Sequence, residues 1–191
     1  MTSAPPPGRR ICVIGTSGAG KTFVAEALAE KLGLTYICND AVIWRPNWQP
    51  APRDKVYGEL EAATRAEGWT FDGNLSSPDL TRRPEDALVL ERCDTLVWLD
   101  LPRWQVHGQV IRRTVGRLLS QEPLWHGNRE SLRTLLWRES IIWWSIRSFG
   151  RRRRDYAALF RDPQQAHRRL IRLRSRREVD AWLPSLPAPS L

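Results

Sequence analysis

The sequence predicts an α/β fold in which helices cover both faces of a five-stranded parallel β-sheet. Two observations carry this prediction. Short apolar runs with the length of strands alternate along the chain with segments that have helical periodicity. The first apolar run leads into the glycine-rich stretch "GTSGAGKT" at 15–22, and a helical segment follows it directly. Strands that alternate with helices are typical of right-handed crossovers and a parallel sheet.

Five segments have the composition of buried strands. They cover residues 10–15, 34–38, 68–74, 94–102 and 168–175. The first helix is predicted from Val24, Leu28 and Leu32, which lie four residues apart, and Gly33 is placed to end it. Further helices are predicted from near Pro52, over 103–119, over about 129–148 and over 178–183.

Length and composition predict one domain. The chain has 191 residues, of which 41% are hydrophobic, enough for a single core. We expect a flexible proline-rich leader over 1–9, the domain over 10–184 and a proline-rich tail over 185–191. The net charge of +9 favours anionic partners such as nucleotides, nucleic acid or acidic lipid, without choosing among them.

The cysteines and the apolar segments favour a cytoplasmic protein. Cys12, Cys38 and Cys93 are odd in number and widely spaced, which suggests neither a disulfide framework nor a zinc site. The apolar stretch at 140–146 is too short to span a bilayer, so no membrane insertion is expected.

The stretch at 15–22 fits the P-loop, or Walker A, pattern G-x-x-x-x-G-K-[ST]. Its glycines let backbone N–H groups turn toward phosphate oxygens at the start of a helix. Lys21 would bridge the β and γ phosphates of ATP, and the Thr22 hydroxyl would hold Mg²⁺. The predicted nucleotide-binding residues are Gly15, Thr16, Ser17, Gly18, Ala19, Gly20, Lys21 and Thr22.

Two strand-end aspartates compete for the magnesium site. The more hydrophobic strand precedes Asp100, but Pro102 follows closely, and a carboxylate there can instead cap the next helix. Asp72 is followed by Gly73 and Asn74, where the backbone can approach a ligand. We therefore treat Asp72, Gly73 and Asn74 as candidate substrate contacts and leave the metal ligand open between the two aspartates.

Several motifs together resemble one family. They are D-G-N at 72–74, D-x-x-x-W at 40–44, D-x-P-R-W at 100–104 and the arginine-rich helix that follows. In combination they resemble the adenylate-kinase-like P-loop proteins known as DNA topology modulation proteins, over about residues 10–183. The resemblance implies the nucleoside/nucleotide kinase type of P-loop NTPase fold, with a helical lid. In such folds the third strand lies beside the first, which would place Asp72 rather than Asp100 near Thr22 and the metal.

The resemblance also implies an acceptor site after the second strand. Asp40 matches by position an aspartate that contacts the acceptor hydroxyl in related small-molecule kinases, where it orients or deprotonates the hydroxyl. A turn-forming aspartate is the alternative. Trp44 and Arg53 would line the pocket, the first by stacking on a planar group and the second by binding an anion. Trp48 lies four residues after Trp44, and a core position is preferred for it.

Kinases of this shape neutralise the transferring phosphate with arginines on a mobile lid. We expect the lid at about 104–138, with its loop at 121–131, where Pro, Gly and Asn occur. The candidate arginines are Arg112, Arg113 and Arg117. The last two lie four residues apart and share one face of the helix, so one of them is preferred, with Arg112 next.

Two functions are consistent with these motifs. The base-reading N-K-x-D and switch D-x-x-G motifs of GTPases are absent, and neither Asp72 nor Asp100 is followed by the glutamate usual in motor and transporter ATPases. The leading hypothesis is an ATP- and Mg²⁺-dependent phosphotransferase acting on a nucleotide, nucleoside or similar small acceptor. The alternative is a nucleotide-binding regulatory protein that contacts DNA through "RRRR" at 151–154, a run that equally fits a solvated helix end.

Overall fold

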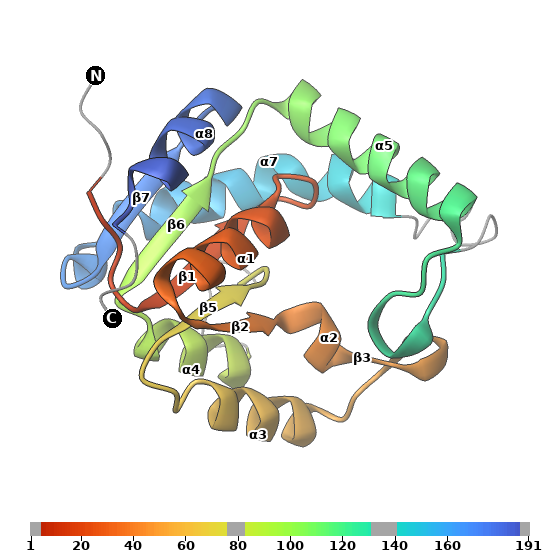
Figure 1. The fold of residues 1–191 in the computed structure, drawn as a ribbon, viewed down its shortest axis with the longest axis horizontal. Helices are drawn as coiled ribbons and strands as arrows, with labels where there is room; N and C mark the ends of the chain where they lie inside the picture. Colours follow the sequence, from red (N-terminus) through yellow and green to blue (C-terminus); the bar gives the residue numbers. More distant parts are fainter. Residues whose placement is uncertain (1–4, 76–82, 131–140, 188–191) are drawn as a thin grey trace.

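The computed structural model describes residues 5–75, 83–130 and 141–187. A five-stranded sheet forms its centre, with the order β2-β5-β1-β6-β7 and only parallel pairings (Figure 1). The strands are β1 (Arg10–Gly15), β2 (Thr35–Cys38), β5 (Trp69–Asp72), β6 (Thr95–Leu99) and β7 (Arg169–Leu173). All five lie where the sequence predicts strands, so the predicted fold class is confirmed.

Helices connect the strands. They are α1 (Lys21–Leu32), α2 (Asn39–Ile43), α3 (Arg53–Ala63), α4 (Pro84–Arg92), α5 (Arg103–Ser120), α7 (Ile141–Leu159) and α8 (Arg176–Ser185). The predicted end of the late helix at 148 is wrong, because α7 continues through the arginine run, whose residues are good helix formers. The beginning predicted at about 129 is not helical at 129–130, and 131–140 lie outside the described residues. Across the described ranges, no helix is long and apolar enough to cross a bilayer.

Shorter elements complete the chain. Two short strands, β3 (Trp44–Arg45) and β4 (Gln49–Pro50), form an antiparallel hairpin, and the turn η1 (Pro46–Trp48) joins them. The turns η3 (Trp125–Gly127) and η4 (Pro163–Gln165) follow α5 and α7. As Figure 1 shows, η3 lies beside β3, far from the sheet.

Alternation along the strands produces one apolar cluster on each face of the sheet. Ile11 and Val13 of β1 pack with residues of α1 and α8, whereas Cys12 and Ile14 pack with residues of α3 and α4. All four side chains are fully buried. Helices therefore cover both faces, as expected for a parallel sheet.

The strand order brings separate parts of the sequence to one edge of the sheet. Asp72, at the end of β5, lies opposite Val13 of β1 on one side and Cys38 of β2 on the other. The loops that leave β1, β2 and β5 therefore begin side by side at the carboxyl end of the sheet. Open parallel sheets bind their ligands at this end.

Residues before β1 contact the neighbouring chain segments. The backbone N–H groups of Arg9 and Arg10 both donate to Oδ2 of Asp94, at 3.0 Å. Arg169 donates to the carbonyl oxygens of Pro6 and Pro7, also at 3.0 Å. These contacts fix the entry to β1.

Candidate functional site

The P-loop connects the end of β1 to the start of α1. Gly18 and Gly20 both have φ of 86°, in the left-handed region that favours glycine. A Cβ atom on Gly18 would lie 2.4 Å from Cγ2 of Val110 and 2.6 Å from the carbonyl oxygen of Val106. The loop therefore packs directly beneath α5, and only glycine fits at this contact.

The side chains of Lys21 and Thr22 lie near the end of β5. The Thr22 hydroxyl donates to Oδ2 of Asp72 at 2.6 Å, and the Tyr36 hydroxyl donates to the same oxygen at 3.4 Å. Lys21 donates from Nζ to the carbonyl oxygen of Thr16 at 3.3 Å. Burial lowers the pKa of Lys21, while the charges of Asp72 and Asp40 act in the opposite direction.

Thr22 and Asp72 offer the oxygen ligands that Mg²⁺ prefers. Magnesium sites in such proteins use one or two carboxylates together with substrate phosphates, so a cluster of three acidic or histidine side chains is not required. No such cluster occurs among the residues that the structure describes. The pair next to the P-loop therefore fits a Mg²⁺ ion that arrives with a nucleotide.

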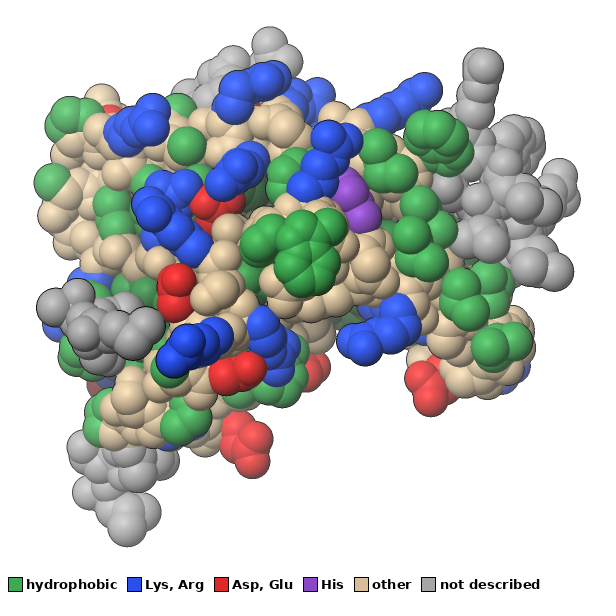
Figure 2. Space-filling view, turned by 90° about the horizontal axis from the view of Figure 1, so that it is seen from above, with side chains coloured by type: hydrophobic (Ala, Val, Ile, Leu, Met, Phe, Trp, Pro, Cys, Tyr) green, Lys and Arg blue, Asp and Glu red, His purple; other side chains and the backbone are tan. Residues whose placement is uncertain are grey.

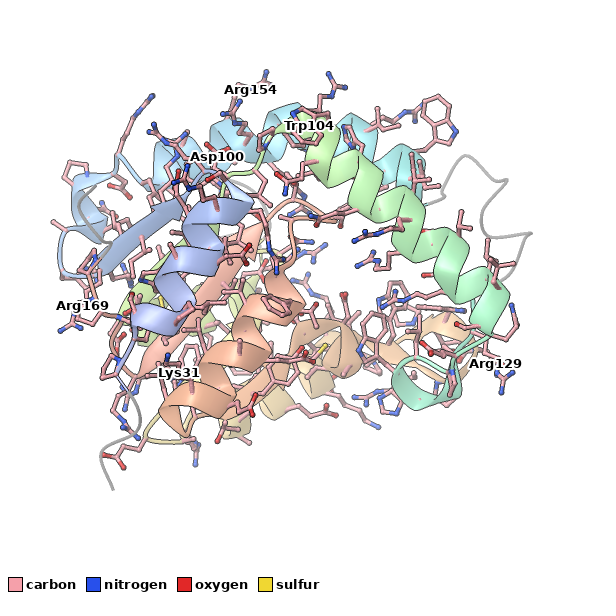
Figure 3. All side chains as sticks on the ribbon, turned by 45° about the horizontal axis from the view of Figure 1, so that its top comes forward. Lys31, Asp100, Trp104, Arg129, Arg154 and Arg169 are labelled. Atoms are coloured by element: carbon pink, nitrogen blue, oxygen red, sulfur yellow. The ribbon has the colours of Figure 1, made fainter. Side chains whose placement is uncertain are left out.

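Asp100, the competing aspartate, has other partners. Arg153 donates from Nε to Oδ1 at 2.6 Å, and Arg172 donates from Nη2 to Oδ2 at 2.5 Å. Asp100 is 5% exposed and lies on the side of β6 that faces β7 and α7 (Figure 3). Its charge is compensated by two arginines, so it acts as the centre of a structural ion-pair group.

Asp40 lies in the first turn of α2, directly after β2. It is open to solvent, yet the surrounding protein limits its hydration, and this raises the pKa of its carboxyl group. The charge of Lys21 is the strongest opposing influence, Asp72 raises the pKa further, and Arg113 and Arg117 lower it. Asp40 therefore belongs to one electrostatic cluster with the P-loop lysine.

The arginines of α5 separate into two groups. Arg113 and Arg117 lie close enough to Asp40 to affect its pKa, and Arg117 also pairs with Glu130 at 3.3 Å. Arg113 is exposed, yet the surrounding protein limits its hydration, and this and the charge of Arg117 lower its pKa. Arg112 is rotated by about 100° around the helix from Arg113 and is exposed. The structure therefore brings Arg113 and Arg117, but not Arg112, to the cluster.

The remaining predicted acceptor residues have mixed placements. The guanidinium group of Arg53 bonds both carboxylate oxygens of Glu85 at 3.3 Å, so it has a protein anion as partner. Gly73 lies against the Phe71 ring and Asn39, where a Cβ atom would approach to 2.4 Å and 2.9 Å. The close contact at Gly73 is thus with protein. Asn74 has a buried Oδ1 atom without a hydrogen-bond partner among the described residues.

The hairpin at 44–50 contacts the segment after α5. Trp48 is half-buried and stacks edge-on against both Trp44 and Trp125, at ring distances of 5.9 and 6.3 Å. The core position preferred for Trp48 is therefore wrong, because the left-handed turn at Asn47 and Trp48 directs it away from the sheet. Trp44 lies in the same aromatic group, four residues after Asp40.

Asn128 holds this junction together. Its side chain is buried and accepts from the backbone N–H of Trp48 at 2.9 Å, and it donates to the carbonyl oxygens of Arg45 and Trp125 at 2.9 and 2.8 Å. The Trp48 indole donates to the carbonyl oxygen of Arg129 at 3.1 Å. The segment at 124–130 is thereby fixed to the chain that follows Asp40.

One charged residue of the site was missed by the sequence analysis. Arg152, inside the run at 151–154, is close enough to Lys21 to lower its pKa. Its guanidinium lies 4.7 Å from the Trp144 ring centroid and donates to the Tyr156 hydroxyl at 3.3 Å, but its buried Nε has no partner among the described residues. Arg153 beside it pairs with Asp100. The run is therefore not a uniform cationic patch.

The fold has relatives among solved structures. The chain is similar to a shikimate kinase from Bacteroides thetaiotaomicron, with 14% sequence identity, a TM-score of 0.56, and coverage of 92% of this chain and 94% of that chain. Two further structures have lower TM-scores. A sugar kinase from Janibacter sp. HTCC2649 has a TM-score of 0.49, 17% identity and coverage of 93% and 95%, and a gluconokinase from Sinorhizobium meliloti 1021 has 0.48, 17%, 94% and 94%.

Sequence comparison adds no family. No family model matches the chain, and no curated protein matches it significantly. Membership of the DNA topology modulation family therefore stays a prediction. The observed strand order and the likeness to the shikimate kinase both indicate the same architecture. The chain has the α/β fold of P-loop kinases.

Proposed function

We propose that the protein is an ATP- and Mg²⁺-dependent phosphotransferase that acts on a nucleotide, a nucleoside or a similar small acceptor. One observation carries the proposal: the Thr22 hydroxyl bonds Asp72 beside Lys21, and Asp40 and Arg113 belong to the same electrostatic cluster. Phosphoryl transfer needs positioned charges of both signs, and these residues supply them. The kinase-like fold is consistent with this activity.

Each side chain has a distinct part in the proposed reaction. Lys21 leaves the Thr16 carbonyl oxygen and binds the β and γ phosphates, with the P-loop N–H groups around them. Asp40 accepts the proton of the acceptor hydroxyl, and its raised pKa makes it a stronger base than a free aspartate. Arg113 of α5 and Arg152 of the neighbouring α7 approach the transferring phosphate and balance its charge.

Thr22 and Asp72 would hold the Mg²⁺ ion. When bound, the ion supplies charge neutralisation for the phosphate oxygens. Because the Asp72 carboxylate already accepts a hydrogen bond from Thr22, these two side chains are oriented before the nucleotide and the ion bind. We also propose that about 104–138 acts as the lid; its described part carries Arg113 and Arg117.

A transfer assay tests the proposal. The full chain is incubated with γ-labelled ATP, Mg²⁺ and a panel of nucleotides, nucleosides, sugars and hydroxylated acids, and Lys21→Ala serves as the control. We expect at least one acceptor to be labelled by the wild type and none by the variant. Isothermal titration calorimetry with ATP shows whether the P-loop of each protein still binds the nucleotide. Normal ATP binding without labelling of any acceptor would contradict the proposal.

A further inference from the structure

The outer side of α5 carries an apolar stripe that no described residue covers. It consists of Trp104, Ile111, Val115 and Leu119, which are 77%, 47%, 44% and 81% exposed. Their spacings of seven, four and four residues place them on one side of the helix. The opposite side is buried through Val106, Val110 and Thr114. We call these four exposed residues the outer stripe of α5.

Size and position make the stripe unusual. Single exposed apolar residues are normal on a protein surface, whereas a contiguous row marks a contact surface. The stripe runs along a helix that lies at the outer edge of the molecule, and Figure 3 shows Trp104 at the beginning of that helix, pointing outward. Leu119, the most exposed of the four, lies at the other end.

The charged residues of α5 are all arginines, whereas Glu122, which is exposed, lies three residues after Leu119. Neither α5 nor residues 141–154 of α7 contain an aspartate or a glutamate. Arg103 and Arg112 are exposed on α5, and Arg151 and Arg154 are exposed on the neighbouring α7. In Figure 2, Lys and Arg side chains lie among the apolar ones on this face of the molecule, and a smaller number of Asp and Glu side chains lie there too.

The adjacent part of α7 repeats the combination of aromatic and cationic groups. Trp143 is 52% exposed, and the Arg147 guanidinium lies 5.8 Å from its ring centroid. Tryptophan and arginine are side chains that place an apolar part and a polar part on either side of a membrane interface. Both α5 and α7 thus expose apolar side chains together with arginines.

We propose that the outer stripe of α5 and its flanking arginines bind an anionic lipid surface. Such a surface offers both chemistries in one plane: acyl chains for Ile111, Val115 and Leu119, and phosphate headgroups for Arg103 and Arg112. The contact is peripheral, because an interfacial helix buries its apolar side only about 5–10 Å deep. It is compatible with the finding that no described helix can span a bilayer.

Other occupants match the surface less well. A second copy of the chain would bring arginine against arginine, since α5 has no acidic residue to pair with them. A nucleic acid strand would supply phosphates and could stack on Trp104, but it would leave the aliphatic residues Ile111 and Leu119 in water. Charge and apolarity together therefore favour lipid.

Vesicle sedimentation tests the proposal. The full chain is mixed with phosphatidylcholine vesicles that contain 30% phosphatidylglycerol, or none, at low and moderate salt. We expect binding to the anionic vesicles, weakened by salt, and little binding to the neutral ones. Leu119→Glu and Ile111→Glu should each abolish it. Arg112→Gln should weaken it roughly fivefold.

A matched variant distinguishes the stripe from general stickiness. Tyr57→Glu changes an exposed apolar residue of α3, 37% exposed, and should bind vesicles like the wild type. Circular dichroism melts confirm that all variants fold. Equal binding to neutral and anionic vesicles, binding to neither, or an equal loss in Tyr57→Glu would overturn the proposal.

Two further measurements address the other occupants. Sedimentation velocity without lipid reports on a second copy, and a labelled oligonucleotide reports on nucleic acid. A dimer that Leu119→Glu dissociates, or oligonucleotide binding that it abolishes while vesicle binding is absent, would contradict the lipid assignment. Slow maleimide labelling of Ile111→Cys in the free protein would show that the chain itself covers the stripe, which also contradicts it.

Discussion

Thr22 and Asp72 are separated by 50 positions in the sequence, yet their side chains share a hydrogen bond of 2.6 Å. The contact exists because β5 pairs with β1, so the end of β5 lies beside the loop that precedes α1. A third strand, β2, pairs with β5 and delivers Asp40 to the same edge. The strand order alone thus assembles the P-loop threonine with both carboxylates.

Asp72→Asn should impair magnesium use more than nucleotide binding. The amide still accepts from Thr22 but lacks the negative charge that holds the ion. We expect the apparent affinity for Mg²⁺ in the transfer assay to fall about 10- to 100-fold. Initial rates over a range of Mg²⁺ concentrations measure this, with ATP binding in EDTA as the control. An unchanged Mg²⁺ dependence would remove Asp72 from the metal site.

Arg113→Gln and Arg112→Gln form a matched pair on one helix. Both arginines are exposed, but Arg113 belongs to the cluster around Asp40, whereas Arg112 lies on another side of α5. We expect the turnover number to fall by about 10³ for Arg113→Gln and less than tenfold for Arg112→Gln. Steady-state kinetics with the acceptor found in the panel checks this. Equal effects would mean that the helix acts only as a support.

The pH dependence of transfer should report Asp40. Its pKa in the folded protein is raised from the ordinary value of 3.8, so the basic form is lost at a higher pH than in a free aspartate. The rate constant kcat/KM should therefore rise with pH through this raised pKa. Asp40→Asn should lower kcat by about 10²–10⁴ and flatten this limb of the profile. A limb that persists in the variant belongs to another group.

Asn128→Ala should release the junction between 124–130 and the hairpin. It leaves the backbone N–H of Trp48 without its buried partner, which costs about 1–3 kcal/mol. Because the junction is far from the core, we expect faster hydrogen exchange at 44–50 and only a small change in Tm. Asn128→Asp keeps the acceptor for Trp48 and should show a smaller effect on that amide. Unchanged exchange in both variants would refute this role.

Gly18→Ala and Gly116→Ala should change stability in opposite directions. The new methyl group at position 18 would collide with Val110 and with the carbonyl oxygen of Val106, at a left-handed φ. At position 116 no atom lies within 4 Å, and alanine favours a helix interior by about 0.8–1.0 kcal/mol over glycine. Chemical denaturation measures both differences. Stabilisation by Gly18→Ala would show that the loop does not pack against α5.

Local sequence predicted the elements well, and the pairing of strands explains what it did not predict. The apolar run before Gly15 and the glycine-rich pattern after it were enough to place β1, the loop and α1. The hydrophobic pattern could not decide whether Asp72 or Asp100 is the metal ligand, because both aspartates follow apolar strands. Both β5 and β6 pair with β1, so the choice depends on the bond from Thr22 to Asp72, and on Arg153 and Arg172 reaching Asp100 from distant segments.

Residues outside regular periodicity were the hardest to place. A spacing of four fits a core helix at Trp44 and Trp48, but the chain there forms a hairpin with a left-handed turn. Arg152 is one of several adjacent arginines, and only the packing of α7 distinguishes it from Arg151 and Arg154. Such distinctions depend on tertiary contacts rather than on local propensity.

The contact between Gly18 and α5 limits how this helix can move. Its first half rests on the P-loop without room for even a methyl group, and its far end continues into the segment that Asn128 fastens to the hairpin. A helix held at both ends can move only by bending between the two contacts or after one of them breaks. The three hydrogen bonds of Asn128, a residue remote from the P-loop, therefore help to set the position of α5 over the P-loop.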